Sequence, residues 1–220
     1  MSSEVIKMDS GEMLKTGTTT VGIVCKDAII LAADKRATAG YLIADKKAKK
    51  VHKINDDMAL TIAGSVSDTQ LLIKLVKAEL KLKKFRVGRA TNVKEAANLL
   101  SGMVYGNIRK MSMMPGISHF LFAGRDKSGL SLYDIFPDGS LTDIDDFVSS
   151  GSGSVFAYGV LETLYKKDLS VDEAIQLAVK SVNAALQRDI ASGNGISMIK
   201  VTSEGVEEIM SKEVIINLND

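Results

Sequence analysis

Three consecutive threonines follow a glycine near the start of the chain, and the first of them carries a hydroxyl that can act as a nucleophile. Thr18, Thr19 and Thr20 come directly after Gly17. A threonine hydroxyl attacks a carbonyl carbon when a base accepts its proton, and a free N-terminal amine can serve as that base. The reference pKa of such an amine, about 7.7–8.0, leaves a substantial fraction unprotonated near neutral pH. Cleavage of the Gly17–Thr18 bond would therefore place a nucleophile and its base on one residue.

The segment before this bond has the composition of a removable leader. Residues 1–17 are polar, with charges of both signs and few apolar side chains, and they end in glycine where a strand-like run begins. Glycine offers the least steric hindrance to attack on its carbonyl group. The plainer interpretation is that threonines at the start of a strand reflect only their strand propensity. The first interpretation predicts a propeptide over residues 1–17 and one catalytic domain over residues 18–220.

Two charged residues stand where neighbouring strands are expected to end and begin. Asp34 closes the second strand-like run, and Lys50 opens the third. If Lys50 lies beside Thr18 and is held by Asp34, its charge favours alkoxide character in the transition state and lowers the pKa of the α-amine. The alternative is a solvated salt bridge on a lysine-rich edge, which contributes little.

Other residue types that often carry chemistry lack the necessary context. His52 and His119 lie in neither a G-x-S-x-G elbow nor an H-E-x-x-H zinc motif, so we expect structural histidines. Cys25 is the only cysteine, which excludes an intramolecular disulfide and suggests a small buried hydrophobe. We expect no metal site and no cofactor.

Two loop motifs remain. The run Gly151-Ser152-Gly153-Ser154 precedes a helix-like segment, but its spacing fits neither a P-loop nor a dinucleotide fingerprint. We interpret it as a flexible start of a helix that also supplies hydroxyl groups. The run Met111-Ser112-Met113-Met114 indicates a soft packing loop, which a neighbouring subunit could cover, because methionine adapts to irregular gaps.

The hydrophobic periods predict grouped strands and grouped helices. Capping pairs, Asn92 with Glu95 and Ser170 with Glu173, open two of the helices. We expect strands over residues 18–24, 28–33, 50–54, 58–63, 117–123, 130–136, 196–201 and 206–209, and helices over residues 68–80, 92–104, 151–165 and 170–188. This order argues against alternating β-α-β units and for antiparallel sheets covered by helix pairs, an α+β fold.

Composition narrows the setting of the molecule. With 220 residues, 45% hydrophobic and 25% charged, the chain suits one globular domain. Its 28 basic and 27 acidic residues nearly cancel, so neither nucleic acid nor an anionic membrane is an expected partner. No run approaches the roughly 18 apolar residues of a membrane span, and the first residues lack the apolar core of a secretory signal. We expect a cytoplasmic protein.

Several separate motifs, in order, closely resemble the family of archaeal, self-processing proteasome β subunits. The resemblance extends from Gly17 to about Val201. It is carried by Thr18 to Ile23, Asp27-Ala28, Asp34-Lys35-Arg36, Lys49-Lys50, Thr61 to Gly64, Gly151 to Ser154, Gln187-Arg188-Asp189 and Ala191-Ser192-Gly193.

The resemblance implies a fold and a site. The fold is a four-layer αββα sandwich of the N-terminal nucleophile hydrolase class, and the activity is that of a threonine-type endopeptidase. Thr18 is the implied nucleophile, its own amine is the base, and Asp34 with Lys50 forms the charged pair beside it. Hydrogen bonding to the amine and its water is the implied role of Ser152, Asp189 and Ser192. The implied oxyanion donor is the backbone N–H of Gly64.

The resemblance also implies a pocket for the substrate side chain. Its members are Ala37, Ala48, His52, Ile62, Val66 and Gln70. Because most of them are small or apolar, we expect cleavage after hydrophobic residues. A protonated His52 would instead admit an acidic side chain.

The implied partners are those of a degradative assembly. They comprise other β subunits in a heptameric ring, rings of α subunits, a regulatory ATPase that acts through the α rings, and unfolded protein substrates.

Two alternatives remain open. One is an inactive subunit that serves as a ring scaffold, and the other is a stand-alone amidohydrolase of the same fold class. Retention of Thr18, Asp34 and Lys50 together favours an active subunit over a scaffold.

Overall fold

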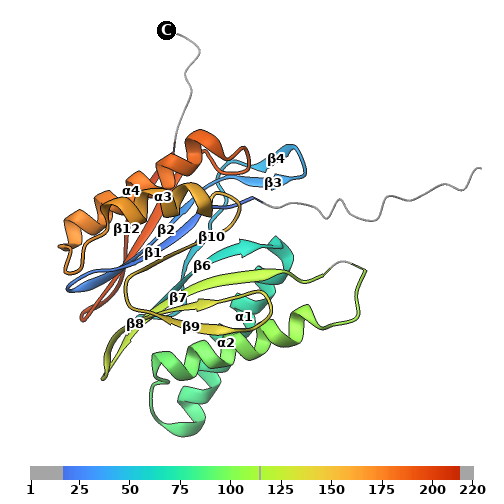
Figure 1. Ribbon diagram of the computed structural model, residues 1–220. Helices are drawn as coiled ribbons and strands as arrows, with labels where there is room; N and C mark the ends of the chain where they lie inside the picture. Colours follow the sequence, from blue (N-terminus) through green and yellow to red (C-terminus); the bar gives the residue numbers. More distant parts are fainter. Residues whose placement is uncertain (1–16, 114, 214–220) are drawn as a thin grey trace, which may run out of the picture.

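The computed structural model describes residues 17–113 and 115–213. Two antiparallel sheets of five strands each pack face to face, with one helix pair on each outer side, as Figure 1 shows. This arrangement confirms the expected four-layer αββα sandwich. None of the helices in the described part of the chain is both long and apolar enough to span a lipid bilayer.

The first sheet begins directly after Thr18 and Thr19. Its order is β10-β1-β2-β11-β12, and every neighbouring pair is antiparallel. Strand β2 lies at the centre and is buried along its whole length, which fits its run of apolar residues. The strands are β1 (Thr20–Val24), β2 (Ala28–Asp34), β10 (Phe147–Ser150), β11 (Gly195–Thr202) and β12 (Gly205–Glu213).

The second sheet is a meander in which strands that follow one another in sequence pair with one another. Its order is β5-β6-β7-β8-β9. The strands are β5 (Val51–Lys53), β6 (Met58–Gly64), β7 (Ser118–Asp126), β8 (Gly129–Ile135) and β9 (Leu141–Ile144).

Each helix pair covers the outer face of one sheet. Helices α1 (Val66–Val87) and α2 (Val93–Ile108) lie on the second sheet, and α3 (Ser154–Leu164) and α4 (Val171–Arg188) lie on the first (Figure 1). The expected capping box opens α4, with Ser170 and Glu173 bonded reciprocally.

Three apolar clusters hold the four layers together. The outer two lie between each sheet and its helices, and include Leu60, Phe120 and Leu100 on one side and Ile30 and Leu177 on the other. The third lies between the two sheets. It contains Ile29, Leu31, Leu121 and Leu132, all fully buried. Alternate residues of one strand therefore enter different cores, as the two-residue period of a strand requires.

Four short strands were missing from the sequence-based expectation. They are β3 (Ala37–Ala39) and β4 (Leu42–Asp45), which form a separate two-stranded hairpin, together with β9 and β10. Strand β4 is exposed along its whole length, and β9 has four residues with an Asp among them. Segments this short and polar give no clear apolar alternation, and tertiary pairing decides their structure. Helix α1 also starts before Asp68 and continues past Leu80 to Val87.

Candidate active site

Thr18 lies near the place where Asp34, at the end of a strand of one sheet, pairs with Lys50, just before the first strand of the other. It is buried and stands two residues before β1 of the first sheet. Asp34 ends β2 of the same sheet, whereas Lys50 directly precedes β5 of the second sheet. The candidate site is therefore built across the packing of one sheet on the other.

The carboxylate of Asp34 organises this region. Its side chain is fully buried. Its Oδ1 accepts hydrogen bonds from the Thr19 backbone N–H at 3.0 Å and from Lys50 Nζ at 2.7 Å. Its Oδ2 accepts from the backbone N–H groups of Arg36 at 3.0 Å and Gly193 at 2.9 Å. A buried carboxylate needs such partners to offset its desolvation, and here four donors converge on it.

Lys50 brings its positive charge to the bond that precedes Thr18. Its Nζ donates to the carbonyl oxygen of Gly17 at 3.2 Å, in addition to Asp34. The Thr18 hydroxyl donates to the same Gly17 oxygen at 2.6 Å. Burial lowers the pKa of Lys50 because the ammonium loses hydration, and the attraction of Asp34 opposes this effect. The Gly17 carbonyl is thus polarised by a cation while the Thr18 oxygen lies beside it.

A second carboxylate joins two serines on the other side of Thr18. Asp189 Oδ2 accepts from the hydroxyls of Ser152 and Ser192, each at 2.6 Å. Ser152 Oγ in turn accepts from the Thr18 backbone nitrogen at 3.3 Å. Ser192 Oγ lies 2.7 Å from the hydroxyl of Thr19. The nitrogen that would become the free amine therefore already faces a hydroxyl that is held by a carboxylate.

Glycines make this close packing possible. A Cβ at Gly17 would lie 1.7 Å from the Ala191 side chain. Gly151 has a φ of +93°, and a Cβ there would lie 2.1 Å from the Thr18 carbonyl oxygen. The Gly151 to Ser154 motif does lead into α3, as expected. The close contacts supply a further reason for its glycines, which is the approach of the backbone to Thr18.

Gly64 ends β6 on the Lys50 side of the site. The N–H of Ile62, two residues earlier, donates to the Lys50 carbonyl at 2.9 Å. Gly64 has a φ of +107°, and a Cβ there would lie 2.3 Å from the Ile117 carbonyl oxygen. The positive φ and the close Ile117 oxygen both require glycine at position 64.

The six residues expected to form the substrate side-chain pocket differ in burial. Ile62 is buried, and Ala37, Ala48 and His52 are half-buried. Val66 and Gln70, on the first turns of α1, are exposed. The Nε2–H of His52 donates to the Lys49 carbonyl at 2.9 Å. Burial is the main cause that lowers the pKa of His52, so the neutral ring is favoured.

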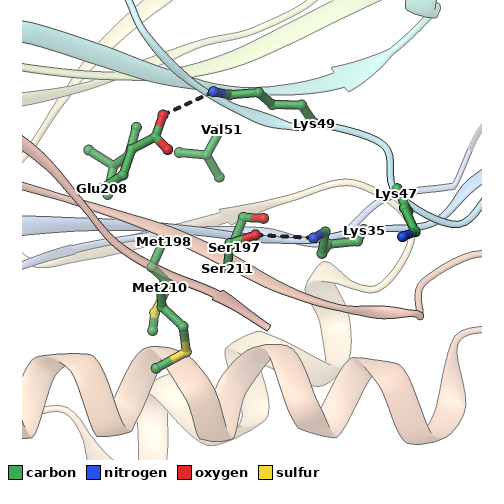
Figure 2. A pocket seen from close by; sticks show the side chains of 10 residues that line it. Lys35, Lys47, Lys49, Val51, Ser197, Met198, Glu208, Met210 and Ser211 are labelled. Atoms are coloured by element: carbon green, nitrogen blue, oxygen red, sulfur yellow. Dashed lines mark hydrogen bonds and ion pairs between the residues drawn. The ribbon is translucent and has the colours of Figure 1, made fainter. Parts of the chain in front are cut away.

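A cavity of about 180 Å³ lies elsewhere, where β11 and β12 meet the segment before β5 (Figure 2). Three lysines, one glutamate, two serines and four apolar residues line it. Lys35 donates to the Ser211 hydroxyl at 3.1 Å, and Lys49 pairs with Glu208 at 2.9 Å. Lys35 and Lys47 also pair with Glu213, so each of these lysines has an acidic partner within the fold.

Two threonines that the sequence did not single out also contact the site. Thr19 donates its backbone N–H to Asp34 and places its hydroxyl at Ser192. Thr38 Oγ1, on the short strand β3, accepts from the Gly17 backbone N–H at 3.1 Å. Thr19 lies in the threonine run, but the two-residue period of a strand would turn it away from the face of Thr18, so the sequence offered no signal for its contacts. No local signal marks Thr38.

His119 and Cys25, the remaining candidate side chains, make structural contacts away from Thr18. His119 contacts Asp134 at 2.6 Å through Nε2 and packs on the Phe136 ring. Cys25 is buried, and burial raises the pKa of its thiol, which disfavours the reactive thiolate.

Comparison with known proteins identifies the family of the chain. The family described as "Proteasome subunit" matches residues 14–201. A "Proteasome subunit beta" of Ferroglobus placidus is 44% identical over 198 residues, which cover 90% of this chain and 92% of the relative. A protein of the same name from Methanocaldococcus fervens is 45% identical over 205 residues, which cover 93% and 90%. Another, from Methanocaldococcus jannaschii, is 45% identical over 199 residues.

The four-layer αββα sandwich is the fold of the N-terminal nucleophile hydrolase class. The chain belongs to the proteasome subunit family, and within that family it is similar to β subunits.

Proposed function

We propose that this chain is the catalytic β subunit of a proteasome core particle, a threonine-type endopeptidase that uses Thr18 after residues 1–17 have been removed. One observation carries the proposal. The Thr18 hydroxyl and the Lys50 ammonium both contact the carbonyl oxygen of the Gly17–Thr18 bond, at 2.6 Å and 3.2 Å. A nucleophile and a cation are thus assembled on the one bond whose cleavage would free the amine of Thr18.

The same groups account for removal of the leader. Thr18 Oγ attacks the Gly17 carbonyl carbon, and the Lys50 charge stabilises the negative oxygen that develops. The C–N bond then breaks, the Thr18 nitrogen takes up the proton that Oγ has lost, and Gly17 is left as an ester on Thr18 Oγ. Water hydrolyses this ester to give a Gly17 carboxylate and a free Thr18 with its α-amine. Asp34 holds Lys50 in place throughout at 2.7 Å.

The mature site repeats this chemistry on substrates. The α-amine of Thr18 accepts the proton of Oγ as the oxygen attacks a substrate carbonyl. The Gly64 N–H donates a hydrogen bond to the oxyanion that forms. The amine returns the proton to the leaving nitrogen, which releases one product. Water then hydrolyses the ester and releases the second product. Ser152 and Asp189 hold the amine, because Ser152 Oγ already contacts the Thr18 nitrogen at 3.3 Å.

Substrate preference follows from the proposed pocket. A neutral His52, favoured by its lowered pKa, does not attract an acidic side chain at neutral pH. The small and apolar character of Ala37, Ala48 and Ile62 supports cleavage after hydrophobic residues.

The proposed partners are those of a degradative assembly in the cytoplasm. They are a heptameric ring of β subunits, rings of α subunits, a regulatory ATPase that acts through the α rings, and unfolded proteins as substrates. Exposed apolar side chains support assembly, since Tyr41 on the β3–β4 hairpin is 89% exposed and Met111 and Met113 are fully exposed.

Two alternatives receive less support. An inactive scaffold subunit has no need of a buried Lys50–Asp34 pair directed at the Gly17 carbonyl, because apolar residues often stabilise a fold as well as a buried ion pair does. A stand-alone amidohydrolase is disfavoured by the similarity of 90% or more of the chain to proteins named as proteasome subunits.

The decisive experiment is intact mass spectrometry of the full chain and of Thr18→Ala, each produced together with α subunits from the same source. The wild-type chain is expected to lose residues 1–17 and to hydrolyse peptides. Thr18→Ala is expected to keep its leader and to lose peptidase activity, because it lacks the attacking oxygen. A mature wild-type chain that retains Met1, or a Thr18→Ala chain that is still processed and active, would overturn the proposal.

A further inference from the structure

A buried asparagine at the end of α2 joins three elements that surround Gly64. Asn107 is only 6% exposed. Its Nδ2 donates to Asp68 Oδ1 of α1 at 2.9 Å and to the carbonyl oxygen of Gly116, just before β7, at 3.0 Å. An amide nitrogen has two hydrogens, and both are used here to connect parts of the chain that are distant in sequence.

These contacts close a ring of hydrogen bonds around the residue that follows Gly64. The Ser65 hydroxyl donates to Asp68 Oδ2 at 2.5 Å. The Ser65 backbone N–H donates to the Ile117 carbonyl at 2.8 Å. Ile117 follows Gly116 directly, so the ring leads from Ser65 through Asp68 and Asn107 back to Ser65.

The position of Gly64 depends on this ring. Gly64 pairs with Ser118 at the last position of the β6–β7 ladder. The Ile117 carbonyl lies so close that a Cβ at Gly64 would be 2.3 Å from it. Asn107 packs equally tightly on the same segment, because a Cβ at Gly116 would lie 2.2 Å from Asn107 Nδ2. A shift of the Gly116–Ile117 segment would therefore move Gly64.

We propose that Asn107 is a positioning residue for catalysis, which holds the Gly64 backbone N–H where the oxyanion forms by joining α1 to the start of β7. Asn107 itself touches no reacting atom. The inference rests on the proposed function, since it assumes that Gly64 donates to the oxyanion in a reaction of Thr18. It adds that the donor is held by a side-chain network reaching back into the helical layer.

The inference predicts a loss of turnover without a comparable loss of substrate binding. Loss of one oxyanion donor costs about 10²–10³-fold in kcat, and small displacements of catalytic groups are also costly. For Asn107→Ala we therefore expect kcat to fall by about 10- to 100-fold, with KM within about twofold of wild type. Asn107→Asp is expected to lose at least as much, because it turns a second carboxylate toward Asp68 and the Gly116 carbonyl.

The experiment uses the assembled particle containing the full chain. Rates are expressed per processed chain, counted by intact mass, so that slow removal of the leader is not mistaken for slow turnover. A peptide boronate provides a second measure, because its boron becomes tetrahedral on Thr18 and presents an oxygen to the same N–H. Its affinity is expected to fall in parallel with kcat/KM.

Asn98→Ala is the matched control. Asn98 lies on the same helix, is exposed, and donates only to the Lys94 carbonyl one turn earlier, at 2.8 Å. It is expected to leave kcat, KM and boronate affinity unchanged. Ser65→Ala removes one hydroxyl from the ring and serves where Asn107→Ala does not assemble. It is expected to lower kcat in the same way, by about three- to tenfold.

The outcomes separate the inference from the proposed function. A wild-type particle without Thr18-dependent hydrolysis would overturn both. An active wild type, with Asn107→Ala or Ser65→Ala within twofold of its kcat and boronate affinity, would overturn the positioning role alone. A variant that raises KM at unchanged kcat would do the same.

Discussion

At the scale of single residues, the charge of Lys50 determines how the site behaves with pH. The ammonium is buried beside Asp34 and contacts the Gly17 carbonyl, which in the proposed reaction is where negative oxygen develops. Burial lowers its pKa below the ordinary value of 10.5. The proton is therefore lost at lower pH than from an exposed lysine, and with it goes the stabilising charge.

We expect a bell-shaped dependence of kcat/KM on pH. Activity rises as the α-amine of Thr18 loses its proton, and falls again, at a pH below 10.5, as Lys50 becomes neutral. Peptidase rates measured across this range test the expectation. Lys50→Arg is the control, because a guanidinium stays charged and its residual activity should lose the alkaline fall. If that fall persists in Lys50→Arg, another group is responsible for it.

At the scale of elements, the start of α3 is packed against the first strand with no space for extra atoms. A Cβ at Gly153 would lie 2.0 Å from the Thr19 hydroxyl and 2.9 Å from the Ala185 side chain. The preceding residue, Ser152, contacts the Thr18 nitrogen. Any displacement of the helix start is therefore transmitted to the candidate amine.

We predict that Gly153→Ala lowers peptide hydrolysis at least about tenfold, because a shift of about 1 Å in a catalytic group has effects of this size or larger. Intact mass and peptidase rates on the assembled particle measure the effect. Gly159→Ala, within the same helix, is the matched control, since a Cβ there meets nothing within 4 Å. It should leave activity unchanged and add about 0.5–1 kcal/mol of stability through helix propensity. Equal activity of the two variants would contradict the argument.

At the scale of the whole molecule, three apolar cores hold four layers in one arrangement, and the site depends on that arrangement. Asp34 ends a strand of one sheet and Lys50 precedes a strand of the other, so they meet only because the inner core fixes how the sheets pack. The outer core between the second sheet and helices α1 and α2 stabilises that sheet. Leu100 is fully buried there.

Leu100→Ala is expected to reduce the free energy of unfolding by about 2–5 kcal/mol, because it removes buried methyl groups and leaves a cavity. Urea unfolding of the purified chain gives the value. Leu75→Ala on α1 is the control, since Leu75 is 43% exposed and should cost well under half as much. Similar losses in both variants would mean that the described core does not dominate stability.

Local sequence was sufficient for much of the fold. The period of apolar residues predicted the four helices and most strands, and Ser170 with Glu173 forms the capping box expected from their spacing. It was insufficient for β3, β4, β9 and β10, since three or four residues carry too little periodicity. The start of α1 was also set by packing and by the turn at Gly64.

The candidate site divides along the same line. Sequence by itself placed the Thr18 hydroxyl directly beside the Gly17 carbonyl, because neighbours in sequence are neighbours in space. Only the tertiary structure decided which partners meet them. Thr19 and Ser192 touch although they are 173 residues apart, and Thr38 reaches Gly17 from a hairpin that no pattern predicted. Contacts between distant segments depend on the packing of sheets and helices, and no local pattern encodes that packing by itself.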